Sequence, residues 1–396
     1  MWQTKKLHEV SSYIARGISP KYVGRGGVLV LNQKCIRDHE VNYIEAKRHD
    51  ASVKSSLSEK LIQVGDVLVN STGVGTLGRV AQVKEIAEPT VVDSHITIIR
   101  PSKDIFDLYF FGWVMIAIED LVKEMGSGAS GQTELSRAEF KQIKISYPES
   151  FSEQQRIVKI LDEVFEGVEQ AKKNAEKNLK NSRELFESYL LNVFTNPGDD
   201  WEMKKLGEVC EGVEYGSSAK SKEEGKVPVL RMGNIQNGRF DWDKLVYSDT
   251  DSEIEKYLLK HNDVLFNRTN SPALVGKTAI YKSEMPAIFA GYLIRIHRKE
   301  NLLDADYLNY YLNCDIARDY GKTVTISSVN QANINGKKLK SYPIPVPPLK
   351  EQKIIVAKFD ELSEQTKKLE AIYKQKIANL DELKKSVLKK AFAGEL

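Results

Sequence analysis

The sequence predicts a mixed α/β (α+β) protein in which two tandem modules are separated and followed by long helices. Three observations predict this fold class: the chain repeats itself once, each half contains short runs rich in Val, Ile and Tyr, and each half ends in a long stretch rich in Glu, Lys, Leu and Ala. At 396 residues the chain is also too long for one ordinary core. We expect a first module at 1–149, a spacer helix at 150–198, a second module at 199–348 and a C-terminal spacer helix at 349–396.

The internal repeat is visible at three places along the chain. Residues 2–10, WQTKKLHEV, return as residues 201–209, WEMKKLGEV, with the same pair of lysines. Residues 61–73 return as 258–270 and keep the pattern Asp-Val-Leu-x-Asn. The beginnings of the two long helices, SEQQRIVKILDEV and KEQKIIVAKFDEL, also match. We therefore expect two copies of one fold in a pseudo-twofold arrangement.

Short apolar runs within the modules predict strands. The expected strands are 28–33, 66–70, 95–101, 227–232, 263–267 and 292–297, with short helices at about 105–124 and 304–320. Each of these helical stretches is rich in aromatic residues, at 106–113 and at 307–312. Because their spacing suits the apolar face of a helix, we expect these aromatic side chains in the core rather than on a base-stacking surface.

Both spacer helices carry apolar residues at the alternating four- and three-residue spacing of coiled coils. In the C-terminal helix this stripe consists of Ile355, Phe359, Leu362, Leu369, Tyr373, Leu380, Leu383 and Val387, and Thr366 and Lys376 interrupt it. Since such a stripe is unstable in water, we expect an antiparallel coiled coil between the two helices, with the modules at its opposite ends. The alternative is a pair of surface helices on one globule.

The amino-acid composition favours a folded protein over a disordered, membrane-spanning or secreted one. Hydrophobic residues make up 41% and charged residues 29% of the chain, which predicts a folded protein rather than a disordered one. No apolar stretch is long enough to span a bilayer, and the N-terminus lacks the apolar core of a signal peptide. The three cysteines are far apart, so we expect no disulfide framework or zinc site, and a reducing cytoplasm. The net charge of +3 favours no particular partner by itself.

Two short motifs resemble nucleotide-binding loops. Gly73 to Gly78 has the form G-x-G-x-x-G, but the residues that follow alternate like a strand, whereas a dinucleotide site needs a helix there. The equivalent loop of the second half ends in Gly276-Lys-Thr278, yet Ser271 stands where a P-loop needs glycine. We therefore expect both loops to be polar connections between strands, with no cofactor bound in this chain.

Catalytic motifs are also missing from the sequence. Neither G-x-S-x-G nor H-E-x-x-H occurs, and His95 and His261 have no visible partners. The triplet Glu202-Met-Lys204 has the letters of a nuclease motif, but its acidic neighbours are too close in sequence. We expect no catalytic residue and no metal ligand in this chain.

What remains is a set of basic, amide and hydroxyl side chains that recur at equivalent places in both modules. Arg, Lys, Asn and Gln read base edges, while Ser, Thr and Lys bind phosphates, so the set predicts a shared DNA-binding face. The candidate DNA-binding residues are Arg16, Lys21, Arg25, Asn32, Gln33, Lys34, Asn70, Thr72, Arg79, Ser127, Ser130 and Gln132 in the first module, and Ser217, Ser218, Lys220, Arg231, Asn234, Asn267, Arg268, Thr269, Lys277, Ser328, Asn330 and Gln331 in the second.

The order of module, helix, module and helix resembles the specificity subunit of type I restriction-modification enzymes. The residues that carry the resemblance are PLKEQKI (348–354) after a Pro-rich strand, its weaker copy SEQQRI (152–157), the Asp-Val-Leu strands and the terminus LKKAFAGEL (388–396). The copies depart from the pattern where Tyr147-Pro-Glu149 replaces the Pro-rich strand end, and where Asn262 replaces glycine before Asp263.

The resemblance implies that each module is a target recognition domain for one half of a bipartite sequence in double-stranded DNA. The helices would space these domains and dock two modification (methyltransferase) subunits, which restriction (endonuclease and translocase) subunits would join. Those partners would supply the S-adenosylmethionine, ATP and Mg²⁺ chemistry, so this chain would be a non-catalytic subunit. The alternatives are a coiled-coil scaffold without DNA recognition and a self-sufficient methyltransferase or nuclease.

Overall fold

The computed structural model describes residues 1–53, 57–127, 133–328 and 331–396. These residues form two compact units. The first unit comprises Met1–Ala175 together with Gln375–Leu396, and the second comprises Glu176–Lys374. Each unit therefore contains one module and a part of both long helices. Among the described residues, no helix combines the length and the apolar character needed to cross a membrane.

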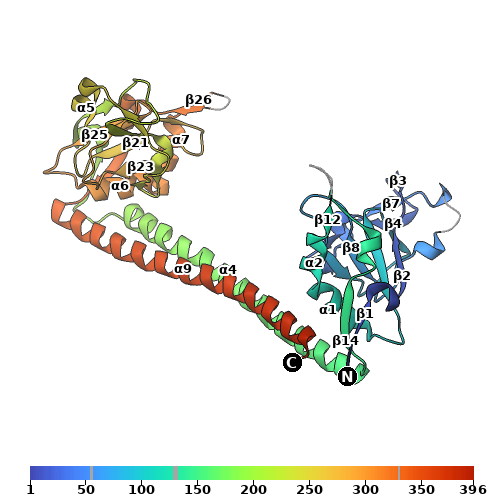
Figure 1. Ribbon diagram of the computed structural model, residues 1–396. Coiled ribbons are helices and arrows are strands. Elements are labelled where there is room, and N and C mark those ends of the chain that lie inside the picture. The colour runs from blue at the N-terminus through green and yellow to red at the C-terminus, as the bar shows by residue number, and fades with distance from the viewer. Residues whose placement is uncertain (54–56, 128–132, 329–330) are drawn as a thin grey trace. The chain divides into compact units, whose positions relative to one another are not determined.

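Two four-stranded sheets form the framework of the first unit (Figure 1). One sheet is antiparallel and has the order β2 (Ser11–Arg16), β11 (Ile96–Pro101), β8 (Val67–Asn70) and β9 (Val80–Gln82). The other has the order β10 (Thr90–Val92), β4 (Val28–Leu31), β7 (Lys47–His49) and β3 (Tyr22–Val23), with β10 and β4 parallel. The remaining elements are β1 (Trp2–Lys6), β5 (Ile36–Arg37), β6 (Glu40–Val41), α1 (Leu108–Ala117), α2 (Glu119–Glu124), β12 (Gly126–Ser127), β13 (Glu134–Leu135), α3 (Arg137–Phe140) and β14 (Lys144–Pro148).

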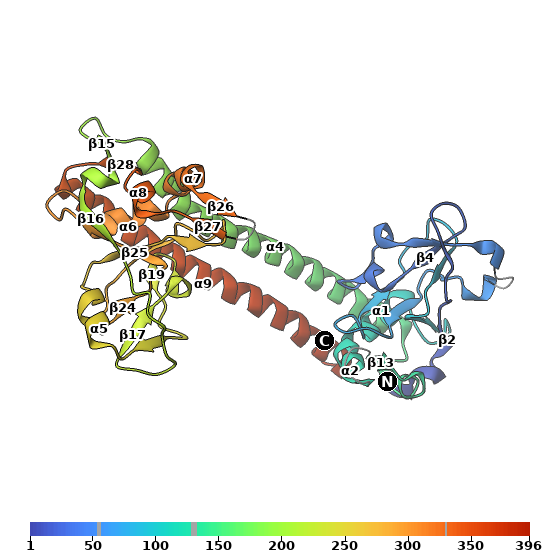
Figure 2. The same ribbon diagram turned by 90° about the horizontal axis from the view of Figure 1, so that it is seen from above.

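The second unit has an antiparallel sheet of the same kind, but its other sheet has three strands, and an isolated bridge between Lys222 and Tyr247 stands where the first unit has β3 (Figure 2). Its antiparallel sheet has the order β16 (Cys210–Tyr215), β25 (Leu293–Arg298), β21 (Val264–Asn267) and β23 (Thr278–Ile280). A three-stranded sheet contains β20 (Val246–Ser248), β17 (Val227–Leu230) and β24 (Ile288–Phe289). The remaining elements are β15 (Glu202–Lys205), β18 (Ile235–Gln236), β19 (Arg239–Phe240), α5 (Asp251–Tyr257), β22 (Thr269–Asn270), α6 (Ala305–Asn313), α7 (Asp315–Val324), β26 (Ile326–Ser328), β27 (Gln331–Asn333), α8 (Gly336–Leu339) and β28 (Pro343–Val346).

Most aromatic residues of the two stretches lie in the core, as predicted, but Tyr109 is 47% exposed. Phe110 and Phe111 in the first unit, and Tyr307 and Tyr311 in the second, are all at most 2% exposed. Each stretch, however, forms two short helices where the sequence predicted one: α1 and α2 meet at Ile118, and α6 and α7 meet at Cys314. The three cysteines of the chain are buried.

The turn before β8 and the turn before β21 are equivalent despite their different sequences. Gly65 has a φ of +93° and Asn262 a φ of +71°, and asparagine is one of the few other residues that adopts this left-handed conformation readily. The following Asp66 and Asp263 each accept a hydrogen bond from a backbone N–H three residues earlier, at 2.8 and 2.9 Å. The replacement of glycine by Asn262 therefore leaves the shape of the turn unchanged.

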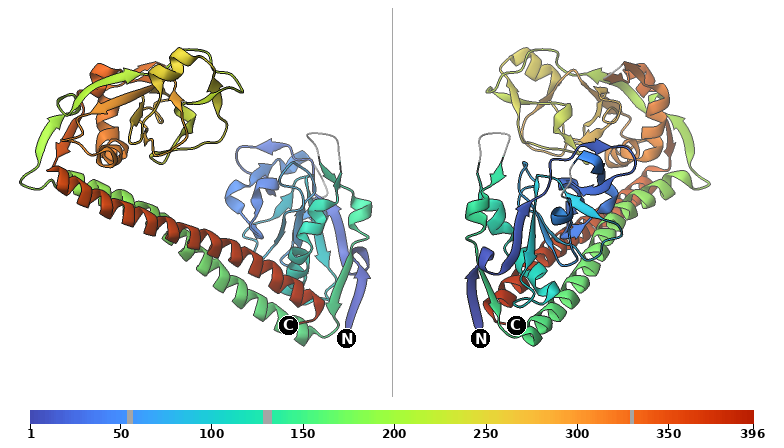
Figure 3. Two further views of the ribbon diagram at one scale, coloured as in Figure 1. Left: turned by 60° about the vertical axis from the view of Figure 1, so that its left-hand side comes forward. Right: turned by 90° about the vertical axis from the view of Figure 1, so that its right-hand side faces the viewer.

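The long helices α4 (Phe151–Thr195) and α9 (Leu349–Ala393) pair antiparallel within each unit (Figure 3). In the first unit Glu169 pairs with Lys384 at 2.9 Å, and Lys172 pairs with Asp381 at 2.7 Å, so numbers rise along one helix as they fall along the other.

In the second unit Arg183 pairs with Glu370 at 3.2 Å. Phe186, Tyr189 and Phe194 of α4 all have ring contacts with Phe359 of α9. Ile355 and Phe359 of the α9 stripe are buried, whereas Leu369 and Leu383 remain 37% and 45% exposed, so the pairing covers the predicted stripe only in part. Burial of such an apolar face is the main source of stability for a long helix in water.

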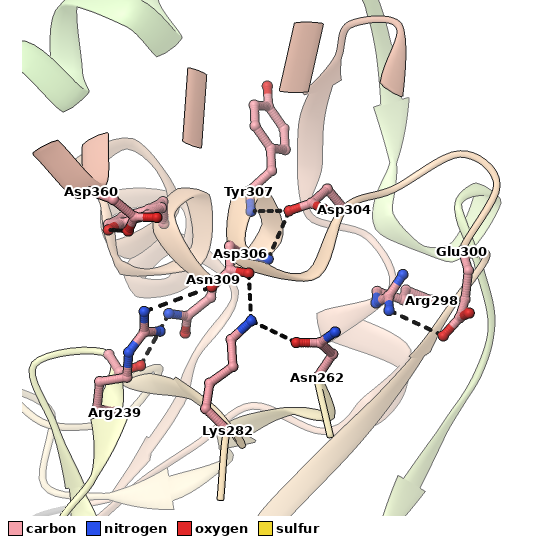
Figure 4. A network of polar contacts seen from close by, with 12 residues as sticks. Arg239, Asn262, Lys282, Arg298, Glu300, Asp304, Asp306, Tyr307, Asn309 and Asp360 are labelled. Atoms are coloured by element: carbon pink, nitrogen blue, oxygen red, sulfur yellow. Dashed lines mark hydrogen bonds and ion pairs between the residues drawn. The ribbon is translucent and has the colours of Figure 1, made fainter. Parts of the chain in front are cut away.

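Helices α1 and α6 both begin at an aspartate cap. The carboxylate of Asp107 accepts hydrogen bonds from two N–H groups of the first turn of α1. Asp304 does the same for the N–H groups of Asp306 and Tyr307, at 3.0 and 3.1 Å (Figure 4). Beside this cap, the Asp306 carboxylate accepts from Lys282 Nζ at 2.7 Å. Such caps satisfy backbone donors that have no partner inside the helix.

A buried glutamine attaches each long helix to its module. Gln154, in the first turn of α4, is 0% exposed. Its Oε1 accepts from the N–H of Asp107 at 2.7 Å, while its Nε2 donates to the carbonyls of Ile105 at 2.9 Å and Pro148 at 2.8 Å. One amide thus connects the end of β14, the start of α4 and the start of α1.

Gln352, in the first turn of α9, makes the same three hydrogen bonds. Its Oε1 accepts from the N–H of Asp304, and its Nε2 donates to the carbonyls of Leu302 and Pro347, all at 2.8 Å. These contacts give a physical reason for the glutamine in the first turn of each helix. Only an amide of this length offers an acceptor and two donors together.

We predict that Gln352→Ala lowers the free energy of unfolding of the second unit by about 3 kcal/mol, since two carbonyls and one N–H lose their buried partner. Urea unfolding followed by circular dichroism measures the loss. Gln365→Ala is the matched control, because Gln365 is exposed on the same helix, and we expect a change within about 0.5 kcal/mol. Equal effects of the two substitutions would contradict the role of Gln352.

Candidate nucleic-acid interface

Equivalent loops follow β8 and β21 and are closed by the same two backbone hydrogen bonds. In the first module the N–H of Asn70 donates to the carbonyl of Arg79 at 3.0 Å, and the N–H of Gly78 donates to the carbonyl of Asn70 at 2.8 Å. In the second module Asn267 bonds to Lys277 in the same way, and Gly276 bonds back to Asn267, both at 2.8 Å. We call these the recognition loops, 70–79 and 267–277.

The glycine that closes each recognition loop has a left-handed backbone. Gly78 has a φ of +83° and Gly276 a φ of +90°. A Cβ atom at Gly78 would also lie 2.9 Å from the backbone nitrogen of Lys123. The chain then continues as a strand, β9 or β23, as predicted. Glycine is therefore needed here for the turn and the close approach to α2.

The asparagines at the base of the loops face inward. Asn70 and Asn267 are both 0% exposed. Asn70 Nδ2 donates to the carbonyl of Gln33 and Asn267 Nδ2 donates to the carbonyl of Leu274, each at 3.1 Å. Both asparagines were predicted to contact DNA, but in the structure their amides are buried and hold the base of each loop.

Three polar side chains meet beside the recognition loop of the first module; we call them the Thr72 cluster. Gln33 Nε2 donates to Thr72 Oγ1 at 2.7 Å, and Thr72 Oγ1 lies 2.8 Å from His95 Nδ1. Gln33 and Thr72 were predicted from sequence, but the expectation that His95 lacks a partner was wrong. No local sequence pattern could reveal the contact between Thr72 and His95, because 23 residues separate them and only the pairing of β11 with β8 brings them together.

A cavity of about 740 Å³ borders the same loop and is lined by Arg37, Arg79, Lys123, Glu119 and His39, together with the loop residues Gly73 and Gly75. Arg79 donates to the carbonyl of Gly75 at 2.9 Å. The side chain of Arg37 is exposed and forms no hydrogen bond or ion pair with any residue that the structure describes. The recognition loop of the first module therefore borders both a polar cluster and a cavity with several cationic groups.

Glu119 is the acidic centre of this cavity wall. Its carboxylate contacts Lys123 Nζ at 2.6 Å and His39 Nε2 at 3.3 Å, and accepts from the N–H of Val80 at 3.1 Å. Burial alone raises the pKa of Glu119, but the hydrogen bonds and charges of His39 and Lys123 outweigh burial and lower the pKa to about 2. Glu119 thus fixes α2, the hairpin of β5 and β6, and β9 in one place.

The second module presents different side chains at the equivalent positions. The carbonyl of His95 accepts from the N–H of Ser71 at 2.8 Å, and the carbonyl of Tyr292 accepts from the N–H of Arg268 at 3.0 Å, so Tyr292 is the counterpart of His95. The Arg268 guanidinium carbon lies 4.9 Å from the ring centre of Tyr215.

The remaining predicted residues fall into two groups. Several are engaged in internal contacts. In the first module Arg16 forms an ion pair with Glu134 at 2.5 Å, Lys21 forms one with Asp50 at 3.4 Å, and Asn32 caps a turn. In the second module Asn234 caps a turn, Ser217 donates to Glu253, Arg231 donates to the carbonyl of Lys244, and Thr269 accepts from Asn333. Others have side chains without a partner among the described residues, namely Arg25, Lys34, Ser218, Lys220 and Lys277, and all but Lys277 are exposed.

Five predicted residues have no described side chain, and one has contacts that are described only in part. Ser130, Gln132 and Asn330 lie outside the described residues, and for Ser127 and Ser328 only the backbone, in β12 and β26, is described. Gln331 lies in β27 and is exposed. The DNA-binding role of the whole set stays a prediction.

We predict that Glu119→Gln destabilises the first unit in a pH-dependent manner. A lowered pKa contributes stability that is present above pH 4.5 and is lost as the pH falls toward 2, about 3 kcal/mol in all. The difference in free energy of unfolding between wild type and Glu119→Gln should therefore shrink across that window in urea titrations. Glu139→Gln, at an exposed position, is the control. A difference that stays constant between pH 7 and pH 3 would contradict the prediction.

Comparison with known proteins also divides the chain into two similar halves. The family described as the type I restriction modification DNA specificity domain matches residues 2–178 and again residues 198–379. A putative type I restriction enzyme MjaX specificity subunit of Methanocaldococcus jannaschii is 34% identical over 201 residues, which cover 49% of this chain and 46% of that protein. The EcoKI specificity subunit of Escherichia coli K12 is 26% identical over 316 residues, covering 76% of this chain and 68% of the relative.

Solved structures share the fold. A chain from a structure on complex assembly and conformational transition of the type I R-M system has a TM-score of 0.79 at 20% identity, covering 100% of this chain and 98% of that one. The HsdS subunit from Thermoanaerobacter tengcongensis has a TM-score of 0.66 at 20% identity, covering 100% of this chain and 97% of that one. With two copies of the domain in two equivalent modules, the chain belongs to the family of type I restriction-modification DNA specificity domains.

Proposed function

We propose that this chain is the sequence-specific DNA-binding subunit of a type I restriction-modification enzyme. The observation that supports the proposal is the pair of specificity domains whose recognition loops share one backbone closure but carry different side chains. Two loops with the same backbone hydrogen bonds but different side chains are suited to recognise two different half-sites of a DNA target. Phosphate contacts would position the DNA, and loop side chains would select the bases.

The domain roles follow from this proposal. Residues 1–149 and 199–348 act as target recognition domains, and residues 150–198 and 349–396 act as spacer helices that dock two modification subunits. Restriction subunits join this core, and the partners supply S-adenosylmethionine, ATP and Mg²⁺. This chain contributes the target sequence and no catalytic group, and the complex acts on DNA in the cytoplasm.

Methylation sequencing of genomic DNA from cells that carry this protein tests the proposal. We expect methylated sites with two specified parts separated by an unspecified spacer. Exchange of residues 1–149 for the first module of a relative should change one part and leave the other unchanged. An unaltered target after the exchange would support a scaffold without DNA recognition, and methyl transfer by the purified chain alone would support a self-sufficient methyltransferase.

A second prediction concerns the spacer. We expect that inserting seven residues after Lys180 of α4, with seven more near Tyr373 of α9, changes the spacer length between the two parts of the target. The paired insertion keeps the ion pair of Arg183 with Glu370 and the heptad spacing on both sides. Neither specified part should change in methylation sequencing, since no loop is altered. An unchanged spacer would contradict the spacing role of the helices.

A further inference from the structure

His95 and Tyr292 occupy one position in the two copies of the fold. The carbonyl of His95 accepts from Ser71, the residue after Asn70, and the carbonyl of Tyr292 accepts from Arg268, the residue after Asn267. Each also stands directly before a central strand of the antiparallel sheet, β11 or β25. Both side chains are exposed, Tyr292 to 50%. Each is therefore an exposed ring fixed at its backbone to the base of a recognition loop.

The Thr72 cluster orients the ring of His95. The Thr72 hydroxyl accepts from Gln33 Nε2 and lies 2.8 Å from His95 Nδ1, so this contact fixes the orientation of the ring. Nε2 has no hydrogen-bond partner among the described residues, so His95 presents one ring nitrogen at the surface.

Tyr292 has no such support. Thr269, the counterpart of Thr72, is 6% exposed and accepts from Asn333 Nδ2 at 2.7 Å, and Tyr292 forms no side-chain hydrogen bond with any described residue. Met232, the counterpart of Gln33, is 36% exposed. The polar cluster of the first module is thus replaced by an aromatic ring and an apolar side chain.

We propose that this position determines specificity in each module, and that the two modules use it with different chemistry. His95 presents Nε2 to a base edge, and in the tautomer in which Thr72 donates to Nδ1 it donates to an acceptor such as guanine O6 or N7 or thymine O4. Tyr292 packs against an apolar base group, such as the thymine methyl. The proposal rests on the proposed DNA-specificity function and adds the residue and the contact for one base in each half-site.

The test uses the complete complex with its modification partners in cells, read by methylation sequencing. We expect His95→Ala to relax the base preference at one position of one half-site, about tenfold or more, with the other half-site unchanged. Tyr292→Ala should relax one position of the opposite half-site. The untouched half-site serves as an internal control, and His261→Ala, at an exposed turn, should change neither.

Two further variants separate base reading from a purely structural role. His95→Gln keeps a hydrogen-bonding side chain and should shift the preferred base while overall methylation persists; His95→Tyr should move the preference toward the chemistry of the second module. The proposal is overturned if wild type methylates a bipartite target and these variants leave both half-sites unchanged, or weaken methylation of every sequence alike. If wild type has no bipartite target, the proposed function itself fails.

Discussion

The fold depends on one buried amide in each module. Gln154 and Gln352 use their acceptor and both donors, so neither side chain can rotate without leaving a buried group unpaired. This fixes where each long helix begins and the direction in which it leaves its own module. The antiparallel pairing of α4 with α9 then adds an apolar cluster in each unit and ion pairs to an attachment that is already defined.

The two copies share a framework and differ in side chains beside the recognition loops. Both copies keep the strand order of the antiparallel sheet, the aspartate cap, the glutamine attachment and the loop closure. The positions that differ between the copies include Gln33 against Met232 and His95 against Tyr292, all beside the recognition loops. Loops on a rigid scaffold are where recognition residues are found, because their side chains are free of packing constraints.

Much of the fold was predictable from sequence because periodicity reports burial directly. The Asp-Val-Leu strands, the long helices and the aromatic core all follow from local patterns. The candidate site was predictable only in part, since identical polar residues can face inward or outward. Asn70 and Asn267 were expected at the interface but hold the loops, whereas His95 was set aside and lies in the Thr72 cluster. The partner of a polar side chain such as His95 lies far away in the sequence, so no local pattern predicts the contact.

The two-bond closure of the recognition loops allows the loops to differ in length while the strands on either side stay in place. Gly78 lies eight positions after Asn70, while Gly276 lies nine positions after Asn267, and the same two bonds close both loops. A loop tied at its base accommodates an added residue without moving the strands on either side, because loop length alone costs little. Insertions and deletions, and not only substitutions, can thus change these loops over generations while the scaffold stays the same.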